Sequence, residues 1–170
     1  AGILVGCLLG FFNGLVITKF KVPPFVATLA MLTIARGLTM LYTNGFPISS
    51  FHTSFTFIGG GWLFGLPVPV WIAAIIVITA IIVTKKIKLG RYIFAIGGNE
   101  NAAKLSGINI NRVKIIVYTI AGAMAAVGGI IVTARLDSAQ PNAGTSYELD
   151  AIAAVVIGGT SLSGGRGSIW

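Results

Sequence analysis

The stretch Ile115–Ala134, IIVYTIAGAMAAVGGIIVTA, contains no charged residue. It has the length of about 20 apolar residues that a helix needs to cross the hydrocarbon core of a membrane. Three similar runs cover Gly2–Thr18, Phe25–Leu41 and Leu66–Thr84. The chain of 170 residues is 55% hydrophobic and only 9% charged, whereas soluble domains carry about 25% charged residues. We therefore predict an all-α polytopic membrane protein, with residues 1–170 forming one transmembrane domain.

Positive charge alternates between the segments that connect these runs. The formal net charge is +8, and the segments 19–24 and 85–114 hold most of the basic residues, while 43–70 has no charged residue. The positive-inside rule predicts that 19–24 and 85–114 are cytoplasmic loops and that 43–70 is an outer, periplasmic loop. Because the basic residues flank apolar runs instead of covering a soluble face, they indicate a lipid bilayer and not a nucleic acid as partner.

Small residues recur at helical spacing in two of the runs. Gly2, Gly6, Gly10 and Gly14 share one helix face. The fourth run repeats the pattern with Ala121, Ala125 and Gly129, flanked by Gly122 and Gly128. Such faces allow close approach of two helices in a membrane. We expect both of them to be buried against other helices of a bundle.

Arg36 is the one charged residue inside the second run. It precedes Tyr42 by six positions, which is roughly 9 Å along a helix at 1.5 Å per residue. A charge at this depth faces the bundle interior, a water path or a partner, or extends outward to the interface. Glu148 and Asp150 are candidate ion-pair partners.

The segment 135–168 follows the fourth run and is rich in glycine. Thr145-Ser146-Tyr147-Glu148 has the pattern of a capping box, which predicts a helix over residues 146–157 that ends at Gly158-Gly159. Such a helix is roughly 18 Å long, about half the hydrocarbon thickness. One interpretation is a re-entrant half-helix beside a substrate route, because broken helices mark such routes in transporters. The other is an outer loop with an amphipathic surface helix.

The basic loop 85–114 contains a short helix with a signal at each end. Asn99 is a good N-cap and Gly107 a good C′ residue, so that the helix covers Glu100–Ser106. We expect Ala102, Ala103 and Ser106 to form a small exposed surface. A short, firmly bounded helix of this kind suits insertion into a groove on a partner, although an ordinary surface helix would fit the pattern too.

Several strings resemble one family of transporters. Glu100-x-Ala102-Ala103-x-x-x-Gly107 is similar to the E-A-A-x-x-x-G loop of ABC importer permeases, with one residue added after the glutamate. Over about residues 1–168, the sequence resembles the ribose-type sugar permeases of the branched-chain amino acid/sugar permease superfamily. The strings that carry this resemblance are PPFVATLAMLTIARGLTMLYTNGFPI, LGRYIFAIGGNENAAKLSGIN, KIIVYTIAGAMAAVGGI and ARLDSAQPNAGTSYELDAIAAVVIGGTSLSGGRG.

The resemblance implies a helical bundle of ABC importer permease type, of which this sequence is an internal part, in a bacterial inner membrane. It implies as partners an ABC ATPase subunit, a periplasmic sugar-binding protein and a second permease copy, with no cofactor on this chain. A coupling helix would contact the ATPase through Asn99, Glu100, Ala103 and Gly107. A second group of residues would line the translocation pathway or contact the binding protein: Arg36, Asn44, Gln140, Glu148, Asp150, Thr160 and Ser161.

The preferred function is therefore the permease subunit that carries ribose or a similar monosaccharide, with ATP hydrolysed by the partner. A branched-chain amino acid permease of the same superfamily is the nearest alternative. A secondary transporter or channel would need no ATPase, but it would be expected to place carboxylates inside the spans, and all four acidic residues here lie in loops or at helix starts. A membrane-embedded enzyme is disfavoured because no catalytic or metal-binding cluster is visible in the sequence.

Overall fold

The structure is a computed structural model that describes residues 1–161 and 164–167. The chain divides into two compact units. The first combines residues 1–71 with 114–143, and the second combines 72–113 with 144–170. Each unit is described by itself below. The predicted segment 135–168 includes residues 162, 163 and 168, which lie outside the described part.

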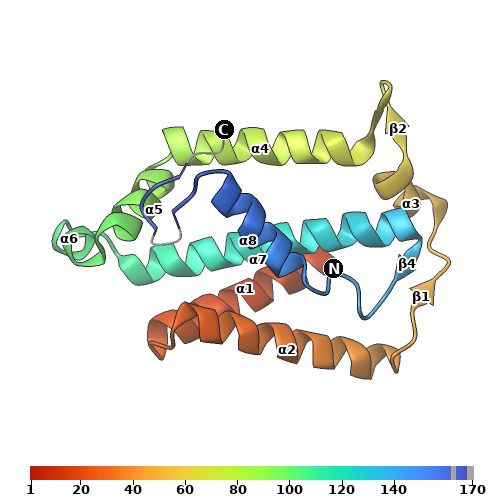
Figure 1. The fold of residues 1–170 in the computed structure, drawn as a ribbon, viewed down its shortest axis with the longest axis horizontal. Helices are drawn as coiled ribbons and strands as arrows, with labels where there is room; N and C mark the ends of the chain where they lie inside the picture. Colours follow the sequence, from red (N-terminus) through yellow and green to blue (C-terminus); the bar gives the residue numbers. More distant parts are fainter. Residues whose placement is uncertain (162–163, 168–170) are drawn as a thin grey trace. The chain divides into compact units, whose positions relative to one another are not determined.

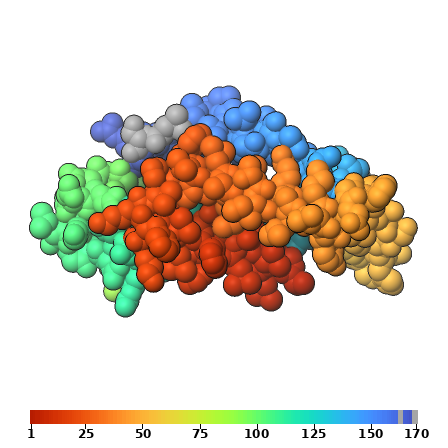
Figure 2. Space-filling model, turned by 90° about the horizontal axis from the view of Figure 1, so that it is seen from below, coloured from red at the N-terminus to blue at the C-terminus, as the bar shows by residue number. Residues whose placement is uncertain are grey.

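Three long helices dominate the first unit (Figure 1). They are α1 (Gly2–Lys19), α2 (Pro24–Thr43) and α7 (Ile110–Leu136), of which the part from Lys114 onward belongs here. Pro23 is the N-cap of α2 and Pro24 its first residue, a position that tolerates proline because the N–H groups of a first turn lack helical partners. The space-filling view shows the red α1 and the orange α2 against each other (Figure 2).

Helix α1 packs on α7 through glycine, as the glycine repeat predicts. A Cβ atom on Gly6 would lie 2.5 Å from the Gly122 carbonyl oxygen and 2.6 Å from the Ala126 Cβ. On α7 the contact is made by Gly122, which flanks the predicted positions and provides the closest backbone approach. Ala121, Ala125 and Gly129 themselves are exposed in this structure.

The uncharged stretch 43–70 is not a plain loop. It contains β1 (Ile48–Ser49), α3 (Thr53–Gly60), β2 (Trp62–Leu63) and β3 (Leu66–Pro67). Strand β1 pairs in antiparallel fashion with β4 (Ser138–Ala139), which follows α7. Helix α3 packs on the end of α7, where a Cβ on Gly59 would lie 2.5 Å from the Ala134 carbonyl carbon and where Ala134 is buried.

Strands β2 and β3 form a tight hairpin. The two turn residues, Phe64 and Gly65, both have positive φ angles, of 50° and 79°, as a two-residue hairpin turn with the right twist requires. The indole N–H of Trp71 donates a hydrogen bond of 3.1 Å to the Leu63 carbonyl oxygen, and the ring of Phe64 meets that of Trp71 edge to face at 6.5 Å. Side chains of the following helix therefore hold the hairpin in place.

The second unit contains most of α4 (Val68–Lys86), followed by α5 (Lys88–Gly98), α6 (Glu100–Leu105) and α8 (Tyr147–Ile157). Helix α5 was not predicted from the sequence. Its half-buried residues Leu89, Ile93 and Ile96 recur at helical spacing, but three glycines conceal the pattern. One of these, Gly90, is buried in the tight turn after α4, where a Cβ would lie 2.6 Å from the Val83 carbonyl oxygen.

Within the described residues, the helices that are long and apolar enough to cross a membrane are α1, α2, α4 and α7. All four predicted runs are thus confirmed as long apolar helices. Threonines in these helices turn their hydroxyl groups onto the preceding turn. The Thr39 hydroxyl, for example, donates a hydrogen bond of 2.8 Å to the Ala35 carbonyl oxygen, so that no donor is left unpaired there in an apolar environment.

The contact between α1 and α7 leads to a first prediction. Replacing Gly6 by Ala should separate the two helices and destabilise the protein, because overpacking of a close contact costs about 1–3 kcal/mol. The control is Gly128→Ala on α7, where an added Cβ meets no atom within 4 Å. The midpoint of thermal aggregation in detergent should fall for Gly6→Ala only, and equal midpoints would contradict this packing.

Candidate functional site

The short helix α6 begins at a well-formed cap. The Asn99 side-chain oxygen accepts a hydrogen bond of 3.0 Å from the backbone N–H of Ala102, and the Asn99 carbonyl accepts one of 3.0 Å from the N–H of Ala103. Glu100 lies in the first turn and Lys104 in the last, which places each charge at the favourable end of the helix dipole. The predicted N-cap role of Asn99 is confirmed.

The other end of α6 is a Schellman motif centred on Gly107. Its N–H bonds to the Lys104 carbonyl at 3.0 Å, and the N–H of Ile108 bonds to the Ala103 carbonyl at 3.1 Å. Gly107 has a φ of 80°, which glycine adopts without the steric penalty that other residues incur. The predicted C′ position is therefore confirmed. Glycine is needed here for its backbone conformation and not for lack of room, since a Cβ would meet nothing within 4 Å.

A second asparagine starts the next helix directly afterwards. The side-chain oxygen of Asn109 accepts a hydrogen bond of 3.1 Å from the N–H of Arg112, and α7 begins at Ile110. The sequence analysis did not single out this cap, although asparagine before an apolar run is a common helix start. Both ends of the connection between α6 and α7 are thus fixed by local hydrogen bonds.

The exposed surface of α6 differs from the predicted one. Ala103 is only 4% exposed, so the expectation that it belongs to the exposed surface is wrong. Leu105, in contrast, is 90% exposed. The reason is geometric: at 3.6 residues per turn, residues two apart lie on opposite sides of a helix, so Leu105 points away from the side on which Ala103 is buried. Glu100 and Ala102 are exposed as well.

Helix α8 begins later than the capping box predicts. Its N-cap is Ser146 and not the predicted Thr145, with a φ of 69° and no hydrogen bond from the Ser146 side chain to the helix. The predicted acidic first turn is present, with Glu148 and Asp150 both exposed. Every residue of α8 is exposed, and beyond the first turn its sequence AIAAVVI is apolar on all sides.

The end of α8 repeats the motif that ends α6. Gly159 has a φ of 81°, its N–H bonds to the Val156 carbonyl at 3.0 Å, and the N–H of Thr160 bonds to the Val155 carbonyl at 3.1 Å. Thr160 and Ser161 then line a cavity of about 490 Å³ in this unit. The predicted break of the helix at Gly158-Gly159 is confirmed.

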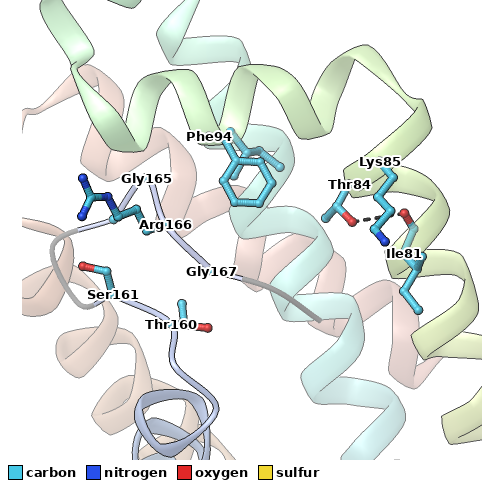
Figure 3. Close-up of a pocket in the computed structure, with 11 residues that line it drawn as sticks. Ile81, Thr84, Lys85, Phe94, Thr160, Ser161, Gly165, Arg166 and Gly167 are labelled. Atoms are coloured by element: carbon cyan, nitrogen blue, oxygen red, sulfur yellow. Dashed lines mark hydrogen bonds between the residues drawn. The ribbon is translucent and has the colours of Figure 1, made fainter. Parts of the chain in front are cut away.

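Figure 3 shows this cavity with Phe94 of α5 on one side and Thr160 and Ser161 on the other. Lys85 of α4 and Arg166 of the glycine-rich segment complete its polar lining. The Thr84 hydroxyl donates to the Ile81 carbonyl oxygen at 3.1 Å, drawn as a dashed line. Of the predicted pathway residues, the structure thus brings together Thr160 and Ser161.

Of the remaining predicted residues, Arg36, Asn44 and Gln140 lie in the first unit, whereas Glu148 and Asp150 lie in α8 of the second. Asn44 is exposed and ends α2 in the left-handed conformation, with a φ of 51°. The Gln140 carbonyl accepts a turn hydrogen bond of 3.0 Å from the N–H of Ala143. Arg36 is half-buried on α2.

The described residues contain no group of three or more side chains that could hold a metal ion. The Nδ1 atom of His52 accepts a hydrogen bond of 3.3 Å from the N–H of Ser54 and caps α3. The histidine therefore has a structural role at this position.

Residues 1–169 match the family described as branched-chain amino acid transport system / permease component. The chain belongs to this family. Its members are transport subunits and not enzymes, and the four long apolar helices make this chain a multi-pass protein of the cytoplasmic membrane.

The relatives of this permease chain include sugar permeases. The ribose import permease protein of Haemophilus influenzae is 51% identical over 171 residues, covering 98% of this chain and 53% of that protein. That of Bacillus subtilis is 54% identical over 159 residues, 92% of this chain and 49% of that protein. The L-arabinose transport system permease protein of Escherichia coli is 41% identical over 157 residues, 92% of this chain and 48% of that protein. The chain thus spans about half the length of these relatives, and no solved structure matches it.

The Schellman motif of α6 gives a second prediction. In the full-length permease, Gly107→Ala should loosen the end of α6, because the left-handed conformation costs a non-glycine residue about 1–2 kcal/mol. Hydrogen exchange of the amides of residues 103–108 should accelerate. Gly107→Asn is the matched control, since asparagine tolerates this conformation better. Equal exchange in the wild type and the alanine variant would contradict the assigned role of Gly107.

Proposed function

We propose that this chain is part of the transmembrane permease subunit of an ATP-driven importer that carries ribose or a similar monosaccharide across the bacterial inner membrane. The observation that carries the proposal is the identity of 51–54% to ribose import permease proteins over nearly the whole chain. The arabinose relative is less similar, at 41%, which favours ribose among the sugars.

The orientation follows from charge. The basic residues Lys85 and Lys86 end α4, and Arg112 and Lys114 lie in the first turns of α7. Because basic residues near the ends of spans favour the cytoplasmic side, α5 and α6 lie in the cytoplasm. The uncharged segment from β1 to β3 then lies on the outer side.

In this orientation α6 is the coupling helix that docks on the ABC ATPase subunit. Two turns of isolated helix are marginally stable in water, but here caps at both ends preform it. Leu105, at 90% exposure, is an apolar side chain that docking would remove from water. Glu100 supplies a polar contact at the other end of the helix, while Asn99 and Gly107 hold the ends in shape.

Helix α8 is a re-entrant half-helix in this proposal. An amphipathic surface helix would have one apolar and one polar face, whereas α8 is apolar on all sides beyond its first turn. A helix of this kind needs to be buried in protein or lipid. Its 11 residues are too few to cross, since a span needs about 20.

The hydroxyl groups of Thr160 and Ser161, at the end of α8, then face the route of a neutral sugar. On the outer side, Asn44, Gln140, Glu148 and Asp150 are available to a sugar-binding protein that delivers the substrate, and Arg36 lies deeper along the route. A second permease copy completes the pore. These partner and pathway roles rest on the family and on the polar chemistry of the side chains.

Uptake of labelled ribose tests the function. Cells that express the full-length permease with its neighbouring ATPase and binding protein should accumulate ribose, and a change that inactivates the ATPase should abolish the uptake. Unlabelled galactose, xylose and leucine serve as competitors. Displacement by sugars alone supports the proposal, whereas uptake that persists without ATP hydrolysis would indicate a secondary transporter or channel.

A branched-chain amino acid permease is the second candidate, because the description of the family names that substrate class. The same experiment separates the two candidates. Displacement of the label by leucine and not by sugars would move the substrate to the amino acid class and leave the ATP-driven mechanism in place.

Docking of α6 is tested by Leu105→Asp. A charge at this position should weaken the association with the ATPase by about ten-fold or more, since an unpaired charge in an interface is costly. The control is Asn101→Asp, an exposed position on the same helix. Copurification of the ATPase with the tagged permease measures the effect, and equal recovery for both variants would remove Leu105 from the interface.

A further inference from the structure

Two pairs of glycines bring distant parts of the sequence into backbone contact in the second unit. Gly97, near the end of α5, lies against the turn formed by Gly164 and Gly165. A Cβ on Gly97 would lie 2.9 Å from the Gly165 Cα, and one on Gly165 would lie 2.6 Å from the Gly98 nitrogen. Real Cβ atoms do not approach other atoms this closely, so only glycine on both sides permits this contact.

The turn belongs to a segment that is bonded to itself and to α8. The N–H of Ser161 bonds to the Arg166 carbonyl at 3.0 Å, and the N–H of Gly164 bonds to the Ser161 carbonyl at 3.1 Å. At its start, the N–H of Thr160 bonds to the Val155 carbonyl of α8 at 3.1 Å. Backbone hydrogen bonds therefore connect the described residues around the turn to the end of α8.

On the other side, the contact lies directly before α6. Gly97 precedes Asn99 by two residues, and Asn99 caps α6 through its side chain and its carbonyl. The N–H of Asn99 bonds to the Ala95 carbonyl of α5 at 3.1 Å. The end of α5 and the start of α6 are thus joined without a flexible linker.

We propose that the backbone contact between Gly97 and the Gly164-Gly165 turn is a mechanical link, through which α8 and the coupling helix α6 move together. Gly97 is a positioning residue in this mechanism, because it acts on transport through α6. The inference rests on the proposed function of the chain as an ATP-coupled permease. It deepens that function by naming how events at the ATPase reach the glycine-rich segment that lines the cavity of Figure 3.

The contact suits this task because it consists of backbone atoms. A displaced side chain can change rotamer and absorb a movement, whereas two backbones in van der Waals contact transmit it. The contact also predicts opposite behaviour for two neighbouring glycines. An added Cβ on Gly97 meets the Gly165 backbone, while one on Gly98 meets nothing within 4 Å.

The test compares Gly97→Ala with Gly98→Ala in the full-length permease, reconstituted with its ATPase and binding protein in vesicles. Alanine favours helix at both positions, so helix propensity cannot weaken either variant. In Gly97→Ala, the stimulation of ATP hydrolysis by the sugar-loaded binding protein and the sugar uptake should both fall about ten-fold, within the usual range of coupling between sites. Basal hydrolysis and copurification of the ATPase should be retained, and Gly98→Ala should match the wild type.

Hydrogen exchange of the amides of residues 164–167 measures the contact itself. Exchange should accelerate in Gly97→Ala and stay unchanged in Gly98→Ala. Full stimulation and uptake in Gly97→Ala would overturn the proposal, as would unchanged exchange. Loss of ATPase copurification in that variant would also overturn it, because the contact would then build the docking surface and not transmit movement. If the wild type shows no ATP-dependent sugar uptake while the exchange changes as expected, the proposed function fails and the contact stands.

Discussion

The absence of water in a bilayer core is the constraint on which the rest of the structure depends, because every backbone N–H and carbonyl at that depth needs a partner within the protein. Helices meet this need internally, and α1, α2, α4 and α7 are long enough to do so across the core. Helices cannot use the hydrophobic effect to associate in lipid, so close packing takes its place. The approach of Gly6 to Gly122 is the result.

In the connection between α4 and α7, local hydrogen bonds stabilise a helix that is too short to be stable alone. Outside the hydrocarbon core a two-turn helix would fray, but Asn99, Gly107 and Asn109 satisfy its ends and start the next helix. The shape of α6 therefore does not depend on a partner. Binding to a preformed helix avoids the loss of conformational entropy that ordering on contact would require.

Features set by neighbouring residues could be predicted from the sequence, and features set by tertiary contacts could not. The four runs and the two ends of α6 depend on composition and on caps within a few residues, and both are confirmed. The exposure of Leu105 and the burial of Ala103 depend on which side of α6 faces the rest of the unit. A helix of six residues is too short for a hydrophobic repeat that would indicate this side. The small-residue pattern of α7 indicated a packing face, but it did not reveal that Gly122, at the edge of this pattern, makes the contact with α1.

The dependence on tertiary contacts also explains which features of the candidate site were not predicted from the sequence. Helix α5 was not predicted because its glycines are typical of a loop, and the packing partner of Gly97 lies 67 or more residues away, at the Gly164-Gly165 turn. The start of α8 was predicted one residue too early. The capping-box pattern places the N-cap at Thr145, but the chain enters α8 through Ser146 in the left-handed conformation.

The threonines of α2 have a consequence for motion. Thr28, Thr33, Thr39 and Thr43 all donate their hydroxyl hydrogens to carbonyl oxygens of α2 itself. None of these hydroxyls donates to a neighbouring helix. Rotation or sliding of α2 against the helices beside it therefore breaks none of these four hydrogen bonds. The threonines make α2 more polar without anchoring it to a neighbouring helix.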